Sequence, residues 1–433
     1  MKFFFPDSQD LVDPSFDFDR ETRASDRVRH RHDQYAHEIF SMPAFDGLLV
    51  SKGIVDGFGA NGGRYTTGQR HRLLRVGAKE FFRTAGLNLP IIGDCGAFTY
   101  VREEKPPYTV DEVLQFYVEC QFDFGISVDH VILAYQPKFD ELSNEDGVIP
   151  RKLIDRQQIT LELASEFMTK RRALRLQFYP IGVAQGWSPG SYARAVSELQ
   201  KMGYDYIALG GMVPLKTREI LECLAKINEI RSSNTRLHLL GVTRTDHVSA
   251  FAGYGVASFD STSPLRQAFK DDKDNYYTLE RTYTAIRIPQ VQGNPALQRM
   301  ISSGVVSQDR ARQLEKSCLE LMRQYASDIC PMEEVLEALV AYETLCGSKR
   351  PHREIYREVL TDRPWTKCSC DICRKLDYHV IIFRGAERNR RRGLHNVWVF
   401  YRRLRRELGL PLDDMENIGV SEQSTPKKFV LSA

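Results

Sequence analysis

Short apolar runs alternate with stretches of helical periodicity along most of the chain. The apolar runs predict strands at residues 46–51, 90–94, 124–133, 176–185, 206–211, 238–243, 257–260 and 283–288. Helical patterns fill most of the gaps between them, and one begins at residues 109–112, which have the sequence of a capping box. Residues 1–40 are polar and charged with little periodicity, and they predict no strand.

Strands that mostly alternate with helices predict an α/β protein, and eight of them favour a (β/α)8 TIM barrel. A doubly wound open sheet is the alternative, since the spacing of strands and helices does not separate the two. The predicted organisation is a catalytic barrel with an N-terminal extension over 1–292, a helical insertion over 293–348, a metal-binding, arginine-rich subdomain over 349–412, and a flexible tail over 413–433.

Composition narrows the class of protein without deciding its function. The 433 residues are 42% hydrophobic and 27% charged, which is ordinary for a soluble globular protein. No stretch approaches the ~20 apolar residues of a membrane span, and the acidic N-terminus has no signal-peptide core. Nine cysteines without regular pairing argue against a disulfide framework. We therefore predict a cytoplasmic protein with no membrane partner.

Three of the cysteines form a cluster that predicts a metal site. Cys368, Cys370 and Cys373 have the spacing C-x-C-x2-C, and His395 follows them. Three thiolates and one imidazole suit tetrahedral Zn2+, and four protein ligands make such a site structural rather than catalytic. We predict one structural zinc ion per chain.

Arginines are dense around this cluster, although the net charge of the whole chain is only +3. Same-sign charges repel each other unless a polyanion is present, and the arginine fork matches phosphate oxygens. The run therefore predicts nucleic-acid binding by Arg384, Arg388, Arg390, Arg391, Arg392, Arg402 and Arg403. A solvated helix face is the alternative. The aromatic residues within the run, Trp398, Phe400 and Tyr401, are predicted to pack this helix onto the body.

Several predicted strands end in a carboxylate, an amide or glycines. Asp94, Asp129 and Asp260 each follow an apolar run, as do Gln185 and the pair Gly210–Gly211. In a barrel these ends converge on the face that carries active sites. An aspartate at a strand end can instead cap the next helix, but three of them beside two glycine-containing ends favour function. Cys95, next to Asp94, is interpreted as a small packing residue.

Taken in order, these motifs resemble the tRNA-guanine transglycosylase family, which consists of zinc-containing TIM barrels that exchange guanine in a nucleic acid for a 7-deazaguanine base. The matching segments are Asp94-Cys95-Gly96-Ala97-Phe98, Ser127-Val128-Asp129, Ala184-Gln185-Gly186, Leu209-Gly210-Gly211-Met212, Leu240-Gly241-Val242, the run from Phe259-Asp260 to Leu265-Arg266, and the C-x-C-x2-C and His-Asn pair. They span about residues 45–290 and 365–407.

The resemblance implies a role for each matched residue. Asp260 would be the nucleophile that forms a covalent intermediate, and Asp94 the general acid and base. Asp129, Gln185, Gly210 and Gly211 would hold the edge of the base, Phe98 and Leu240 would cover its two faces, and Arg266 would contact the nucleic acid. This chain departs from the family pattern at Cys95 and Ala97, at Trp187, and at His238 and Leu240, where the family more usually has Tyr and Met.

The opening residues and the segments GDCGAFTYV and SVDHVI are most similar to the DNA-modifying, DpdA-type branch of the family. That branch is associated with placing 7-cyano-7-deazaguanine (preQ0) in DNA. One alternative keeps the chemistry and makes tRNA the substrate. Another is a non-catalytic nucleic-acid-binding subunit, which the presence of both Asp94 and Asp260 disfavours. The sequence leaves open a homo-oligomer and accessory DNA-modification proteins.

Overall fold

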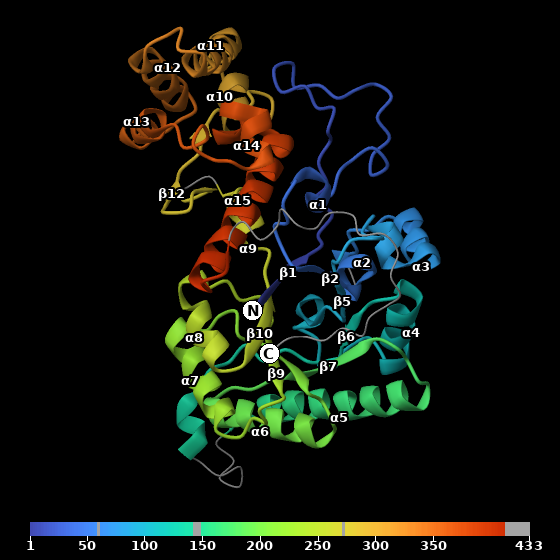
Figure 1. The fold of residues 1–433 in the computed structure, drawn as a ribbon. Helices are drawn as coiled ribbons and strands as arrows, with labels where there is room; N and C mark the ends of the chain where they lie inside the picture. The colour runs from blue at the N-terminus through green and yellow to red at the C-terminus, as the bar shows by residue number, and fades with distance from the viewer. Residues whose placement is uncertain (59–60, 142–148, 271–272, 412–433) are drawn as a thin grey trace.

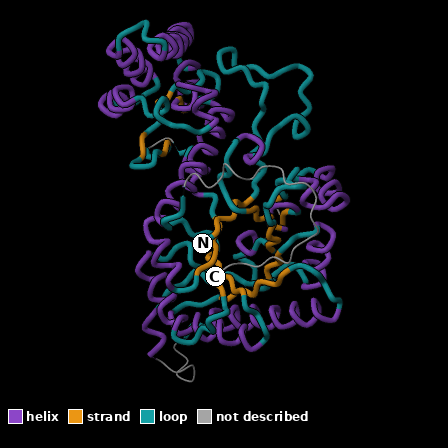
Figure 2. The backbone as a smooth tube through the Cα atoms, in the orientation of Figure 1, coloured by secondary structure: helices purple, strands orange, loops and turns teal. Residues whose placement is uncertain are grey.

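Eight parallel strands close into a barrel at the centre of the molecule, in the order β1-β10-β9-β8-β7-β6-β5-β2. Figure 2 shows them as a ring inside the helices. The computed structural model describes residues 1–58, 61–141, 149–270 and 273–411, so the predicted tail over 413–433 lies outside the described residues. The barrel strands are β1 (Lys2–Pro6), β2 (Gly47–Ser51), β5 (Ile91–Asp94), β6 (Phe124–Ile126), β7 (Tyr179–Ala184), β8 (Tyr206–Leu209), β9 (Arg236–Leu239) and β10 (Val256–Asp260). The TIM barrel is confirmed, and the open-sheet alternative is wrong.

The chain begins with a barrel strand that the sequence pattern did not predict. In β1 the three phenylalanines, Phe3 to Phe5, are buried, and Phe4 pairs with Gly47 of β2 on one side and with Asp260 of β10 on the other. The polar residues that follow masked this short run. Because β1 lies between the first and last of the other strands, it closes the barrel.

The predicted strand at 283–288 is not part of the barrel. Its residues fall in two short pairings instead, β12 (Thr282–Tyr283) with β11 (Tyr276–Tyr277), and β13 (Ile286–Arg287) with β14 (Ile382–Phe383). The second pairing joins the end of the barrel segment to the chain near the cysteine cluster. A further small hairpin joins β3 (Gly57–Phe58) and β4 (Asn61–Gly62).

Helices surround the barrel (Figure 1). They are α3 (Thr67–Phe81), α4 (Val110–Cys120), α5 (Arg151–Ala173), α6 (Pro189–Lys201), α7 (Thr217–Asn228) and α8 (Val248–Gly253), with the short helices α1 (Ala36–Ile39), α2 (Lys52–Val55) and α9 (Ser263–Gln267) in connecting segments. The predicted capping box opens α4, where the hydroxyl of Thr109 accepts from the backbone N–H of Glu112. None of the helices in the described ranges is long and apolar enough to cross a membrane.

After the barrel the chain forms a group of helices at one side (Figure 1). It comprises α10 (Pro295–Ser302), α11 (Gln308–Ala326), α12 (Met332–Leu345), α13 (Arg353–Asp362) and α14 (Asp371–Leu376), followed by the long α15 (Gly385–Glu407). Figure 1 shows α15 running from this group back to the barrel. His395 lies well inside α15, which begins at Gly385.

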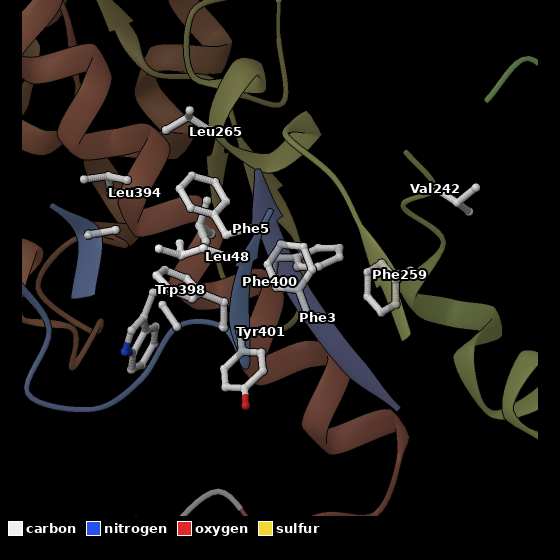
Figure 3. Packing of buried hydrophobic residues seen from close by; sticks show 14 of the residues in the cluster. Phe3, Phe5, Leu48, Val242, Phe259, Leu265, Leu394, Trp398, Phe400 and Tyr401 are labelled. Carbon is white, nitrogen blue, oxygen red and sulfur yellow. The ribbon is translucent and has the colours of Figure 1, made fainter. Parts of the chain in front are cut away.

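Aromatic side chains attach α15 to the barrel. The centre of the Phe400 ring lies 5.0 Å from that of Phe3 and 6.0 Å from that of Phe259. Figure 3 shows the rings of Phe400 and Phe3 next to each other. The hydroxyl of Tyr401 donates to Asp46 at 2.7 Å, and Trp398 is buried. The prediction that these aromatic residues pack the helix onto the body is confirmed. Since Phe3 and Phe259 belong to β1 and β10, α15 supports the strand that ends at Asp260.

Candidate active site

A cavity of about 170 Å³ opens at the carboxyl ends of the barrel strands. Asp94 and Asp260 are the last residues of β5 and β10, while Gln185, Gly210 and Leu240 directly follow β7, β8 and β9. All eight residues predicted for catalysis and base binding line this one cavity: Asp94, Phe98, Asp129, Gln185, Gly210, Gly211, Leu240 and Asp260. Drug-sized ligands occupy pockets of about 300–1,000 Å³, so this cavity is sized for a smaller ligand.

Asp94 carries a perturbed pKa in this cavity. Burial, together with the nearby charges of Asp129 and Asp260, raises the pKa of Asp94 to about 7. One carboxylate oxygen accepts the backbone N–H of Gly96 at 3.0 Å. An acid whose pKa is close to neutral can both give and take a proton during a reaction.

Asp129 is held on both of its carboxylate oxygens. The amide of Gln185 donates to Oδ2 at 2.7 Å, and the thiol of Cys95 donates to Oδ1 at 3.3 Å. Burial raises the pKa of Asp129 to about 6, although these two hydrogen bonds oppose the rise. Burial and the charge of Asp129 raise the pKa of the Cys95 thiol, so it stays protonated and keeps its donor. Cys95 is therefore more than the small packing residue that the sequence suggested.

The glycines after β8 make room for this arrangement. A Cβ atom at Gly210 would collide with the side chain of Gln185, and one at Gly211 would collide with the carbonyl oxygen of Ile132. Gly211 also has a φ of 72°, which favours glycine. The missing Cβ atoms at this strand end thus leave space for the side chain of Gln185 as well as for the cavity.

Asp260 is bound through one oxygen only. Its Oδ1 accepts the backbone N–H of Gly241 at 3.0 Å and lies 3.1 Å from Nε2 of His238. Within the described ranges, no hydrogen bond reaches Oδ2. Sequence reasoning noted His238 as a departure from the family pattern but gave it no role. His238 lies in β9, two positions before the cavity residue Leu240, and this alternation gives its side: both side chains can face the barrel interior, but the role of His238 depends on its neighbours.

The four predicted metal ligands come together beside α15. The thiol sulfurs of Cys368, Cys370 and Cys373 and a ring nitrogen of His395 all lie within 4.8 Å of one another. His395 Nδ1 is 3.6, 3.4 and 3.3 Å from the three sulfurs in turn. Its Nε2 lies 2.8 Å from the carbonyl oxygen of Tyr277, which fixes the ring with Nδ1 toward the thiols. This group could hold a metal ion.

The predicted arginine face is largely buried, so the expectation of an exposed positive surface is wrong for most of its members. Arg384 pairs with Glu21 and Glu315, each at 2.6 Å, and Arg388 pairs with Glu21. These acids come from segments far away in the sequence, which is why the run looked unopposed.

Four further arginines of the run also have partners within the protein. Arg391 pairs with Glu387 at 2.6 Å, and the fully buried Arg392 donates to the carbonyl of Ala268 at 2.6 Å. Arg402 is buried above the ring of Trp398, and Arg403 donates to the carbonyl of Thr278 at 2.8 Å. These side chains fasten α15 to its neighbours instead of facing a polyanion.

Three other arginine side chains stand near the barrel mouth. Arg64 and Arg266 are exposed, and the side chain of Arg390 is 23% exposed. All three lie close enough to Asp10, which follows β1, for their charges to oppose the rise in its pKa that burial causes. Arg266 sits in α9, a few residues after Asp260. Positive charge from three separate segments therefore gathers around Asp10.

A comparison with curated proteins finds one relative of almost the same length. A DNA-guanine transglycosylase from Salmonella montevideo is 50% identical over 418 residues, which cover 96% of this chain and 99% of that protein. No protein-family model matches the chain.

Proposed function

The chain belongs to the DNA-guanine transglycosylases, a branch of the guanine transglycosylase family of pentosyltransferases, and on that premise we propose that it exchanges guanine in DNA for 7-cyano-7-deazaguanine (preQ0). The observation that carries the proposal is the cavity in which Asp94, Asp129 and Asp260 converge, in a chain that is half identical to such an enzyme.

The exchange proceeds in two displacements at C1′ of the target nucleotide. Oδ2 of Asp260 bonds to C1′ as the bond from C1′ to N9 of guanine breaks, and Asp94 gives its proton to the leaving base. The incoming base then loses its N9 proton to Asp94 and bonds to C1′, which releases Asp260. Covalent catalysis of this kind divides one difficult step into two easier ones. The pKa of Asp94, about 7, suits both proton transfers.

The polar wall of the cavity recognises the base. Asp129, fixed by Gln185 and Cys95, presents carboxylate oxygens to the N–H groups of a guanine-like edge, and Gly211 offers its backbone. Phe98, 52% exposed at the rim, and Leu240 cover the two faces of the ring. A base in duplex DNA must leave the stack to enter such a cavity.

Phosphate contacts of the DNA fall to the arginines at the rim. Arg266 and Arg64 are exposed near Asp10, and Arg390 joins them from α15. Because backbone contacts position a nucleic acid without reading its sequence, these arginines serve any target context.

The Cys3His group binds one structural zinc ion. A tetrahedral site with Zn–S bonds of about 2.3 Å and a Zn–N bond of about 2.0 Å has a sulfur-to-nitrogen edge of about 3.5 Å. The observed separations between 3.3 and 3.6 Å match that edge. A bound ion would crosslink α14 and α15 as a structural ion.

The test compares two polymers. The protein is incubated with 7-cyano-7-deazaguanine and either duplex DNA or tRNA, and the nucleosides from each digest are identified by mass. A modified deoxynucleoside from DNA alone is expected, and the Asp260→Asn variant should give none. A modified ribonucleoside from tRNA alone would replace DNA by tRNA as the substrate. Failure of both polymers would favour a non-catalytic subunit or a different base.

A further inference from the structure

A line of buried polar side chains runs into the barrel behind the carboxylate of Asp260. Nε2 of His238 lies 3.1 Å from Oδ1 of Asp260, and Nδ1 of His238 lies 2.6 Å from the hydroxyl of Ser258. The hydroxyl of Ser258 makes a short hydrogen bond with that of Tyr206. His238, Ser258 and Tyr206 are 0%, 1% and 4% exposed, and they come from the adjacent strands β9, β10 and β8.

These groups lie in an otherwise apolar interior. Tyr206 belongs to the cluster inside the barrel that includes Phe4, Leu49, Ile181 and Val183. Burying a hydroxyl or an imidazole in such surroundings costs free energy unless each polar atom finds a partner. Among the described residues, the side-chain hydrogen bonds of these three groups reach only one another and Asp260, which indicates a role at Asp260.

The hydrogen bonds have one consistent direction. A carboxylate only accepts, so the proton of a neutral His238 must be on Nε2, pointing to Asp260. Nδ1 then accepts the proton of the Ser258 hydroxyl, whose oxygen accepts from Tyr206. If Nδ1 of His238 instead carried the proton and donated to Ser258, a lone pair on Nε2 would face the carboxylate of Asp260. Ser258 would then donate to Tyr206, and the Tyr206 hydroxyl would have no acceptor among the described residues.

We propose that His238 is a positioning residue for the nucleophile, and that Ser258 and Tyr206 hold it in the tautomer that donates to Asp260. Together with the backbone N–H of Gly241, His238 binds Oδ1 and leaves Oδ2 as the oxygen that bonds to C1′. The inference rests on the proposed function, in which Asp260 is the nucleophile.

The same two donors act in both halves of the exchange. When Oδ2 bonds to C1′, the carboxylate becomes an ester and Oδ1 becomes its carbonyl oxygen. When the incoming base attacks C1′, the bond from Oδ2 to C1′ breaks and its electron pair returns to the carboxylate. Donors already aimed at Oδ1 stabilise that returning charge without rearrangement. Loss of His238 is therefore expected to slow the chemical steps and to leave binding of the incoming base almost unchanged.

The test uses labelled guanine as the incoming base, because exchange of guanine for guanine does not depend on which 7-deazaguanine is natural. His238→Phe removes both ring nitrogens at similar size, and His238→Gln returns an amide donor. His238→Phe should lower kcat about 10²–10³-fold with KM for guanine within about threefold, and His238→Gln should recover at least tenfold of the loss. Ser258→Ala and Tyr206→Phe keep His238 but weaken the hydrogen bonds that fix the proton on its Nε2. Each should lower kcat about tenfold.

Asp260→Asn, assayed beside these variants, separates the two proposals. If Asp260→Asn still exchanges guanine, the nucleophile of the proposed function is wrong. If Asp260→Asn is inactive and His238→Phe keeps kcat within twofold of the parent, the positioning role alone is overturned. Should His238→Phe fail to fold, Ser258→Ala and Tyr206→Phe decide, and an unchanged kcat in both would equally overturn it.

Discussion

Three aspartates share the cavity without a compensating cation. None of the residues that line it within the described ranges is lysine or arginine. Burial and mutual repulsion therefore raise the pKa of Asp94 to about 7, and burial raises that of Asp129 to about 6. A site that only held the fold together would not retain such costly charges. Titratable groups with displaced pKa values identify the acid and base of a reaction.

Replacing Asp94 should therefore stabilise the protein while stopping the reaction. An unfolded aspartate has a pKa near 3.9, so between pH 4 and pH 7 the folded protein binds a proton that the unfolded chain has lost. Stability of the parent falls with rising pH through that range. Asp94→Asn should be more stable by about 1–3 kcal/mol at pH 8, and guanine exchange should fall by at least about 10²-fold.

Chemical denaturation at pH 5 and pH 8 measures the difference in free energy of unfolding between Asp94→Asn and the parent, and this difference should be larger at pH 8. Asp26→Asn, at an exposed position, is the control for removing one carboxylate. If Asp94→Asn gained less stability over the parent at pH 8 than at pH 5, the raised pKa of Asp94 would be contradicted.

At the scale of elements, the barrel strands were predictable where an apolar run stands between polar residues. β2, β5 and β8 are such runs, and their ends revealed Asp94 and Gly210. β1 was missed because its three phenylalanines sit next to a polar segment of 30 residues or so. His238 was missed because a histidine in a strand has no fixed meaning until its neighbours on β8 and β10 are known.

The arginines of α15 show a different limit of sequence reasoning. Their charge could be counted, but Glu21 and Glu315, which neutralise it, lie in the N-terminal segment and in α11. Burial raises the pKa of Glu21, but the hydrogen bonds and charges of Arg384 and Arg388 outweigh burial and bring it to about 2. Glu21 thus ties the start of the chain to α15.

Glu21→Gln should destabilise the fold by about 3–5 kcal/mol at pH 7, because it leaves buried arginines without their partner. The unfolded glutamate has a pKa near 4.3, so the stabilising contribution of Glu21 is complete above about pH 5 and is lost as pH falls toward 2. In chemical denaturation, the free energy of unfolding of Glu21→Gln should therefore be much lower than that of the parent at pH 7 and only slightly lower at pH 3.

Glu320→Gln, which breaks an exposed ion pair on α11, is the matched control and should change stability little at either pH. An equal effect of Glu21→Gln at both pH values would show that its charge is not what ties the two segments together.

Arginines at the rim should behave differently from those inside α15. Arg266→Ala should reduce the slope of log K for duplex DNA against log salt concentration by about one, since one phosphate contact is lost. Arg388→Met should lower the unfolding temperature and leave that slope unchanged. If Arg388→Met changed the salt dependence of DNA binding and Arg266→Ala did not, the arginines of α15 would be the ones that contact DNA.

At the scale of the whole molecule, the Cys3His group stands where three separate parts of the chain meet. Cys370 and Cys373 belong to the start of α14, and His395 to α15. Tyr277 of β11 accepts from the ring of His395, and the hydroxyl of Tyr276 lies 3.3 Å from the sulfur of Cys373. One ion here would join the helical group, α15 and the β11 hairpin. The same helix α15 packs against β1 and β10, so the Cys3His group and the strand that ends at Asp260 are connected through one helix.

Purified protein should therefore contain about one zinc ion per chain, and removing it should weaken exchange without touching the cavity. Without the ion, three thiols, two of them buried, and a buried imidazole lose their common partner, and α15 loses its fixed position against β10. A strong chelator should lower the unfolding temperature and the exchange rate together, and added Zn2+ should restore both. Cys370→Ser should reproduce the loss, while Cys330→Ser, outside the cluster, should not. If the chelated protein kept its unfolding temperature but lost exchange, the metal would act in the reaction itself, and its structural assignment would be wrong.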